Sequence, residues 1–197
     1  MKSEKIYQAL HAHGIMRARD LVALGVSREY ISQLCQREMI ERTGRGLYRL
    51  PDGNISAYHT FVEASQRVPQ GIICLLSALR FHQITTQAPF EVWMAIEVKA
   101  WRPQVADLPL RIVHFSGAAF TEGTEEHLVE GVTVKVYAVA KTVADCFKYR
   151  NKIGFDVALE ALRDCRRQKR CTNNQLWNYA NICRMSNVMR PYLEATL

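Results

Sequence analysis

Apolar residues recur at helical spacing three times within the first 40 residues, and each run is followed by turn residues. The first predicted helix ends at His13-Gly14, and a second, short one ends at Gly25. A third helix is predicted from about Arg28 to Glu38, because Ser27 is a favourable N-cap residue. Three short helices with a tight turn between the second and third are therefore expected at the N-terminal end.

The third predicted helix has two contrasting sides. At 100° per residue, Ile31, Leu34 and Cys35 fall on one side, which predicts a buried face. The other side carries a hydroxyl, two amides and a guanidinium, from Ser32, Gln33, Gln36 and Arg37. Such a row can hydrogen-bond to many different groups outside the helix.

A hairpin is predicted directly after this helix. The pattern changes to alternation after Met39, and two short strands flank Thr43-Gly44-Arg45-Gly46. The two glycines permit the positive φ angles of a tight turn, and Arg45 lies at its tip. Arg42 and Arg49 lie on the flanking strands.

This order of three helices and a hairpin is that of a winged helix-turn-helix, which binds DNA. In that interpretation the polar row Ser32, Gln33, Gln36 and Arg37 reaches base edges in the major groove. Four arginines would hold phosphates or enter the minor groove: Arg28, Arg42, Arg45 and Arg49. The alternative is an amphipathic surface helix followed by an ordinary hairpin.

A domain boundary is expected where Leu50-Pro51-Asp52-Gly53-Asn54 interrupts the pattern. We therefore predict a winged helix-turn-helix domain over residues 1–51 and a larger domain over residues 52–197. In the larger domain, strands are predicted near residues 72–74, 90–98, 108–115, 127–130 and 132–137, and helices at 58–68, at 77–82 and from residue 139 onward. The predicted fold class is α+β, with a central sheet and C-terminal helices.

Charge is distributed unevenly along the 197 residues, whose formal net charge is +7. Residues 1–50 carry 9 Lys+Arg against 5 acids, residues 51–140 carry 6 against 9, and residues 141–197 carry 11 against 5. Basic ends around an acidic middle favour a polyanionic partner, with nucleic acid as the leading candidate. The six cysteines include no C-x-x-C pair and are interpreted as reduced core residues of a cytoplasmic protein. No secretion signal or membrane span is predicted.

A second basic face is predicted in the C-terminal part. The spacing of Arg163, Arg166, Arg167 and Arg170 places four guanidiniums on one side of a helix, with Lys169 beside them. This face could contact phosphates of DNA or RNA, or it could simply be solvated. The sequence leaves these alternatives open.

Two carboxylate and lysine pairs are the candidates for chemistry. Glu97 and Lys99 close a predicted strand on the same side, as in metal-dependent nucleases of the PD-(D/E)xK type, but no aspartate stands at a suitable distance upstream. Lys141 and Asp145 are spaced for an ordinary intrahelical ion pair. No metal ligand set, phosphate loop or cofactor is expected, and the sequence is interpreted as that of a non-enzyme.

The sequence resembles the AbiEi-type antitoxins of bacterial abortive-infection systems over nearly its whole length. The resemblance rests on the order of the first three helices and on three stretches: residues 45–51 (RGLYRLP), residues 76–79 (LSAL) with His82 and Thr85, and residues 136–150 (VYAVAKTVADCFKYR). The last stretch is the most specific. The family has no established catalytic residues to transfer to this sequence.

This resemblance implies a transcriptional regulator that represses its own promoter by binding inverted repeats as a monomer or dimer. It also implies a C-terminal domain that counters a nucleotidyltransferase-like toxin, without a stable complex, in a type IV toxin-antitoxin system. The alternatives are the nuclease using Glu97 and Lys99, and a C-terminal module that binds RNA or a partner. No membrane partner is expected.

Overall fold

The structure is a computed structural model that describes residues 2–44, 46–51, 56–105 and 108–195. The chain divides into two compact units, which are described separately. The first comprises Met1–Pro69, Val105–Leu108 and His127–Val134. The second comprises Gln70–Gln104, Pro109–Glu126 and Lys135–Leu197. The predicted division into residues 1–51 and 52–197 stays a prediction, and residues 52–55 lie outside the described part.

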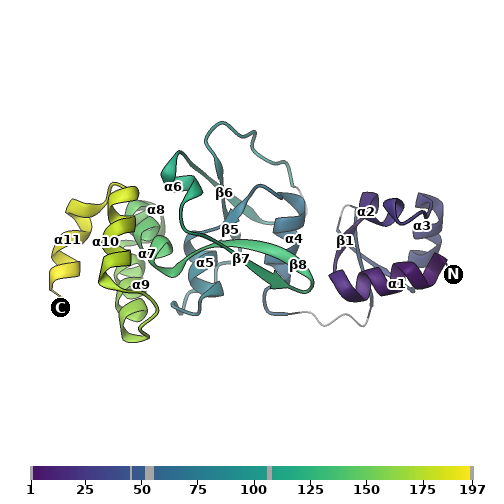
Figure 1. Ribbon diagram of the computed structural model, residues 1–197, viewed down its shortest axis with the longest axis horizontal. Coiled ribbons are helices and arrows are strands. Elements are labelled where there is room, and N and C mark those ends of the chain that lie inside the picture. The colour runs from purple at the N-terminus through teal and green to yellow at the C-terminus, as the bar shows by residue number, and fades with distance from the viewer. Residues whose placement is uncertain (1, 45, 52–55, 106–107, 196–197) are drawn as a thin grey trace. The chain divides into compact units, whose positions relative to one another are not determined.

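The first unit begins with three helices in the predicted order (Figure 1). They are α1 (Lys2–His13), α2 (Ala18–Ala23) and α3 (Arg28–Gln36). A later helix of this unit is α4 (His59–Arg67). Apolar residues from the first three helices and the adjoining segments form one buried cluster, whereas Val22 of α2 is 38% exposed. The cluster contains Ile6, Leu10, Leu21, Val26, Ile31, Leu34 and Ile40. The helices are therefore held by their apolar sides, as the spacing predicted.

A small antiparallel sheet completes the N-terminal part of this unit. It consists of β1 (Met16–Arg17), β2 (Glu41–Gly44) and β3 (Leu47–Arg49), in the order β1-β3-β2. The turn between β2 and β3 differs from the prediction, since Gly46 has a φ of +75° whereas Gly44 stays in the strand. Gly44 instead lies against the end of the Arg67 side chain: a Cβ there would be 2.0 Å from Arg67 Nη2, so the guanidinium would have to move.

A five-stranded mixed sheet has the order β6-β5-β4-β8-β7. Its strands are β4 (Ile72–Ile73), β5 (Val92–Glu97), β6 (Leu110–Phe115), β7 (Thr124–Val129) and β8 (Val132–Tyr137). β5 pairs antiparallel with β4 and parallel with β6. All five correspond to predicted strands, and β5 is buried from Val92 to Ile96 because it lies inside the sheet.

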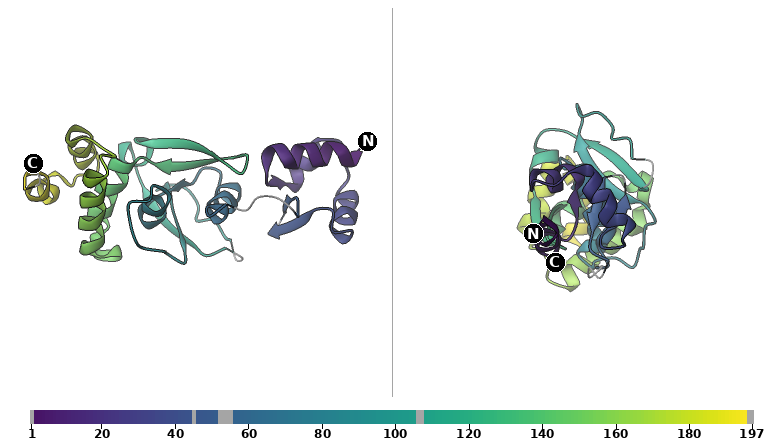
Figure 2. Two further views of the ribbon diagram at one scale, coloured as in Figure 1. Left: turned by 90° about the horizontal axis from the view of Figure 1, so that it is seen from below. Right: turned by 90° about the vertical axis from the view of Figure 1, so that its right-hand side faces the viewer.

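Helices complete the second unit. α5 (Leu75–Phe81) follows β4, and the short α6 (Ala118–Thr121), which the sequence did not predict, follows β6. Five helices gather at one end of the sheet (Figures 1 and 2). They are α7 (Val139–Lys148), α8 (Arg150–Ile153), α9 (Phe155–Arg167), α10 (Asn173–Ile182) and α11 (Ser186–Glu194). The fold is therefore α+β, as predicted.

α7 is the central helix of this group. Every residue from Val139 to Phe147 is buried, and α7 packs against α5, α9 and α10. The core around it joins sheet residues such as Phe115 and Tyr137 to residues of the C-terminal helices. None of the helices in the described part of the chain is both long enough and apolar enough to cross a membrane.

The prediction of six reduced cysteines is wrong for one pair. Cys165 and Cys171 are joined by a disulfide, and their Cα atoms are 6.2 Å apart. The end of α9 turns back on itself and brings the two residues together, which the linear spacing did not indicate. The other four are free cysteines, and Cys74, Cys146 and Cys183 are buried.

Candidate nucleic-acid interface

The start of α3 is fixed by local interactions. Gly25 has a φ of +87°, which lets the chain turn sharply after α2. Ser27 is the N-cap, and its hydroxyl accepts a hydrogen bond of 3.2 Å from the backbone N–H of Tyr30. A backbone hydrogen bond and one from Ser27 hold the pKa of Glu29 below its usual value. This keeps a negative charge at the positive end of the helix dipole.

The two sides of α3 have opposite environments. Ile31 and Leu34 are only 1% and 2% exposed and pack into the core of the first unit. The polar row predicted for the outward side is exposed along its full length: Ser32, Gln33, Gln36 and Arg37. Arg37 is the C-cap of the helix rather than part of it. This side presents hydroxyl, amide and guanidinium groups that can exchange water for other hydrogen-bonding partners.

Two of the predicted phosphate-contacting arginines are exposed. Arg28 begins α3, and Arg42 lies on β2. The Nε of Arg42 donates a hydrogen bond of 3.2 Å to the carbonyl oxygen of Gly44, which orients the guanidinium along the hairpin. Arg45, predicted at the tip, lies outside the described residues. The hairpin strands thus add positive charge close in sequence to the polar row.

Arg49 lies in a different environment from the other arginines. Its Nη2 is 2.6 Å from the Glu41 carboxylate on the neighbouring strand, and its side chain is only 16% exposed. The ion pair with Glu41 occupies guanidinium N–H donors of Arg49 that would otherwise be available to a phosphate. The predicted phosphate contact of Arg49 stays a prediction.

The predicted second basic face is not continuous, because α9 ends at Arg167. Lys169, beyond the helix end, has a φ of +53°, and this turn carries Arg170 away from the helical row. The Nη1 of Arg170 then lies 3.4 Å from the carbonyl oxygen of His82. The expectation that Arg163 and Arg170 share one helix face is therefore wrong.

The other two arginines of that face are engaged within the second unit. Nη2 of Arg166 donates to Asn173 Oδ1 at 2.6 Å and to the carbonyl oxygen of Leu193 at 3.0 Å. Burial lowers the pKa of Arg166. Arg167 is paired with Asp164 at 2.9 Å. Whether this region binds nucleic acid stays a prediction, but its geometry gives no row of four guanidiniums.

The residues of the nuclease interpretation do not share a strand. β5 ends at Glu97, and Lys99 lies in the turn that the hydrogen bond from Ala100 N to the Glu97 carbonyl oxygen closes. The expectation that both side chains project from one side of a strand is not met. In the described ranges, no group of three or more His, Cys, Asp or Glu side chains is arranged to hold a metal ion.

Lys141 and Asp145 form the ion pair that their spacing predicted. Their Nζ and Oδ2 atoms are 2.6 Å apart, and the two side chains are 0% and 1% exposed. Lys141 Nζ also lies 4.1 Å from the centre of the Tyr137 ring, and Cys183 Sγ donates to Asp145 Oδ1 at 3.2 Å. Burial raises the pKa of Asp145, and the Lys141 charge opposes this rise. No exposed atom of either side chain is left for a ligand, so the pair is a core interaction.

Three helices followed by a hairpin, with a polar and exposed third helix, are the arrangement of the helix-turn-helix class of folds. Residues 4–51 match the family described as "Transcriptional regulator, AbiEi antitoxin", which confirms the resemblance for this part of the chain. No curated protein matches the chain.

The fold is shared with a solved structure. The chain is similar to the crystal structure of the RV2827C protein from Mycobacterium tuberculosis, with a TM-score of 0.61 and 13% sequence identity. The similarity covers 91% of this chain and 71% of that chain. It therefore extends well beyond the residues of the family match. At this identity it shows a common fold and nothing about function.

Proposed function

We propose that the protein is a DNA-binding transcriptional autorepressor and antitoxin that binds inverted repeats in its own promoter. The observation that carries this proposal is the exposed polar row of α3 beside a short basic hairpin. The family match over residues 4–51 supports a regulator of this kind. The system would be a bacterial type IV toxin-antitoxin system of the abortive-infection class.

The polar row is proposed to read base edges in the major groove. α3 has nine residues, and an α-helix with its side chains is about 10–12 Å across, which fits a major groove about 12 Å wide. Gln33 and Gln36 can each bond an adenine through two hydrogen bonds, while Ser32 and Arg37 reach neighbouring positions. Arg28, Arg42, Arg45 and Arg49 contact phosphates or enter the minor groove, which fixes the register. Inverted repeats call for two copies of the chain, one on each half-site.

Fluorescence anisotropy with the DNA upstream of the gene tests this proposal, with a scrambled duplex for comparison. Gln33→Ala and Gln36→Ala should each weaken promoter binding by about 1–3 kcal/mol and leave scrambled binding unchanged. Arg42→Ala should weaken the binding of promoter DNA and of scrambled DNA alike. It should also reduce the slope of log affinity against log salt concentration by about 0.9 in magnitude, because one phosphate contact is lost. The matched control is Gln8→Ala, which removes an exposed amide from α1 and should change neither.

Two results would contradict the proposed interface. One is equal binding of promoter and scrambled DNA by the wild-type chain. The other is a salt slope that changes as much for Gln33→Ala as for Arg42→Ala, because base and phosphate contacts differ in their dependence on salt.

The antitoxin role is proposed to use the part of the chain that follows the DNA-binding residues. The toxin is a nucleotidyltransferase-like protein, which the antitoxin opposes without a stable complex. Co-expression of the full chain with the product of the adjacent gene should restore growth. The Gln33→Ala/Gln36→Ala variant should still restore growth but lose promoter repression in a reporter strain. Failure of the wild-type chain to restore growth would contradict this role.

The proposed function lies in the cytoplasm and includes no catalytic step or cofactor. Plasmid DNA incubated with the protein and Mg²⁺ or Mn²⁺ should remain intact. Cleavage that is lost in both Glu97→Gln and Lys99→Gln would replace the regulator with the nuclease interpretation.

A further inference from the structure

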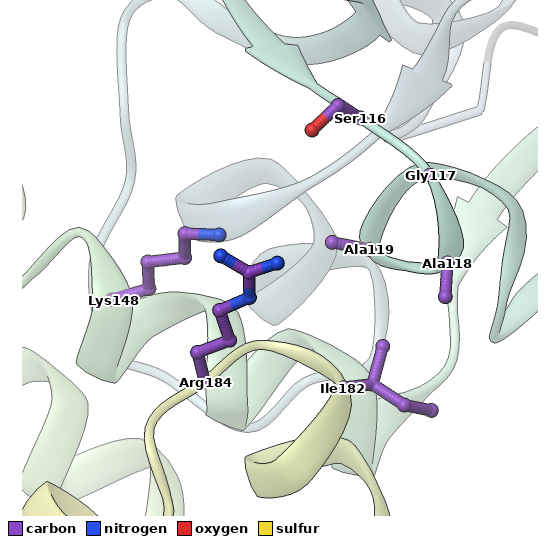
Figure 3. Close-up of a pocket in the computed structure, with 7 residues that line it drawn as sticks. All are labelled: Ser116, Gly117, Ala118, Ala119, Lys148, Ile182 and Arg184. Carbon is purple, nitrogen blue, oxygen red and sulfur yellow. The ribbon is translucent and has the colours of Figure 1, made fainter.

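A basic pocket lies between β6 and the C-terminal helices of the second unit. Its volume is about 270 Å³. Seven residues line it: Ser116, Gly117, Ala118, Ala119, Lys148, Ile182 and Arg184. Figure 3 shows the ends of the Lys148 and Arg184 side chains directed toward the same space, with the Ser116 hydroxyl facing it from the β6 side. Lys148 and Arg184 come from different elements, so only the tertiary fold brings them together.

The two cations in this pocket have no direct partner in the protein, although the Lys148 charge acts at longer range on buried Asp145, which is already paired with Lys141. Among the described residues, neither Lys148 Nζ nor the Arg184 guanidinium has a hydrogen-bond or ion-pair partner. No acidic residue is part of the described lining. Two like charges that face one space repel each other unless an anion lies between them. An unpaired cation pair with a hydroxyl beside it is therefore suited to an oxyanion.

The backbone at Arg184 is anchored in an unusual conformation. Arg184 follows α10 with a φ of +59°, in the position after a helix end where glycine is most common. Hydrogen bonds from Arg184 N to Asn181 O (3.0 Å) and from Met185 N to Ala180 O (2.7 Å) hold this turn. Lys148, in turn, is the last residue of the buried helix α7. Both charged side chains thus start from fixed backbone, which reduces the ordering needed when a ligand binds.

We propose that this pocket binds the phosphate monoester group of a small molecule, a site that is independent of the proposed DNA interface. A monoester dianion matches the two positive charges, and its three terminal oxygens can accept from Lys148, Arg184 and Ser116. Ile182 and Ala119 supply an apolar wall for the group that carries the phosphate. The volume is just below the roughly 300–1,000 Å³ of drug-sized sites, so the pocket would enclose the phosphate and a sugar-sized group and leave a base attached to that sugar outside.

Isothermal titration calorimetry of the full chain provides the test, with inorganic phosphate, adenosine 5′-monophosphate, adenosine and 3′,5′-cyclic AMP as the probes. Inorganic phosphate and the monophosphate should bind, adenosine should not, and the cyclic diester should bind at least tenfold more weakly because it carries one charge. Monoester affinity should also fall below about pH 6, where the dianion takes up a proton. Equal binding of the cyclic diester and the monophosphate would overturn the proposal. The pocket would then attract any phosphate, including the diesters of a nucleic-acid backbone, without selecting a monoester.

Arg184→Gly is the decisive variant, because glycine prefers this backbone conformation and the fold should be at least as stable. Its monophosphate affinity should fall about 10- to 100-fold, the usual effect of losing a charge-assisted hydrogen bond. Lys148→Gln should have a similar effect. The matched control is Lys169→Gly, which also replaces an exposed cation at positive φ but lies away from the pocket lining. The proposal fails if the control loses as much affinity as Arg184→Gly, or if no probe binds the wild-type chain at millimolar concentration.

Discussion

Helices α3 and α7 both carry polar residues at helical spacing, yet the fold gives these residues opposite environments. In α3 only Ile31 and Leu34 are buried, and the polar row faces water. In α7 all residues from Val139 to Phe147 are buried, including Lys141 and Asp145. The polar groups of α3 are available to a partner, whereas Lys141 and Asp145 of α7 are paired with each other. A polar pattern on a helix therefore indicates a binding surface only where the rest of the fold leaves that side uncovered.

The largest effect is expected inside α7. Asp145→Asn removes one charge and leaves Lys141 buried without its counter-ion, which should lower the free energy of unfolding by about 3–5 kcal/mol. Urea denaturation followed by circular dichroism measures this loss. The double variant Lys141→Met/Asp145→Leu removes both charges and should recover most of the stability. A loss below about 1 kcal/mol for Asp145→Asn would show that the pair is not a buried ion pair.

The two sides of α3 should respond very differently to truncation. Leu34→Ala leaves a cavity in the core of the first unit and should cost about 3 kcal/mol of unfolding free energy. Gln33→Ala, one residue earlier on the exposed side, should change it by no more than about 0.5 kcal/mol. Thermal and urea denaturation of both variants test this contrast. Similar losses for the two substitutions would mean that the polar row is packed rather than free.

Glu130, in the first unit, is less buried than the ion pair of α7 and less exposed than the polar row of α3. Its carboxylate lies 2.7 Å from His59 Nδ1 and accepts a hydrogen bond of 2.7 Å from Ser56 N. Burial raises the pKa of Glu130, but these hydrogen bonds outweigh burial and leave the pKa below its usual value of 4.5. The ionised carboxylate therefore stabilises the fold above pH 4.5, and this stabilisation is lost as the pH falls through the lowered pKa.

Glu130→Gln should therefore cost about 1.5 kcal/mol at pH 7, and the difference from wild type should shrink below pH 4.5. Urea midpoints measured between pH 3 and pH 7 provide the comparison. A difference that stays constant over this range would show that the charge of Glu130 makes no contribution. The loss of unfolding free energy expected for Glu130 is therefore smaller than that for the buried ion pair of α7 and larger than that for the exposed polar row of α3.

Local patterns predicted the stretch from α1 to β3 well, because these elements depend mainly on near neighbours in the sequence. The Ser27 cap, the buried Ile31 and Leu34, and the exposed amides all follow from helical periodicity. The shape of the turn did not follow, since Gly46 has a positive φ while Gly44 stays in β2, against the side chain of Arg67 from a later helix. The exposed part of the candidate interface was thus accessible from the sequence, and the interactions of Arg49 were not.

The second unit shows what periodicity omits. The predicted arginine face assumed that α9 continues, but the chain turns at Lys169 although no glycine or proline marks the helix end. The inward hydrogen bonds of Arg166 depend on Asn173 and Leu193, which a helical wheel does not include. Lys148 and Arg184 meet only through the packing of α7 and α10. These features arise from tertiary contacts, so no local rule could predict them.

The strand β1 ties the start of α2 to the hairpin, since Met16 pairs with Tyr48 and Ala18 N donates to Gly46 O at 2.9 Å. The helical part and the hairpin are therefore coupled through the backbone itself and cannot adjust their separation freely. Under the proposed function, the DNA duplex must therefore bend or twist to let the helical part and the hairpin contact it at the same time. Operators rich in flexible pyrimidine–purine steps would then bind more tightly than stiff ones with the same contacted bases.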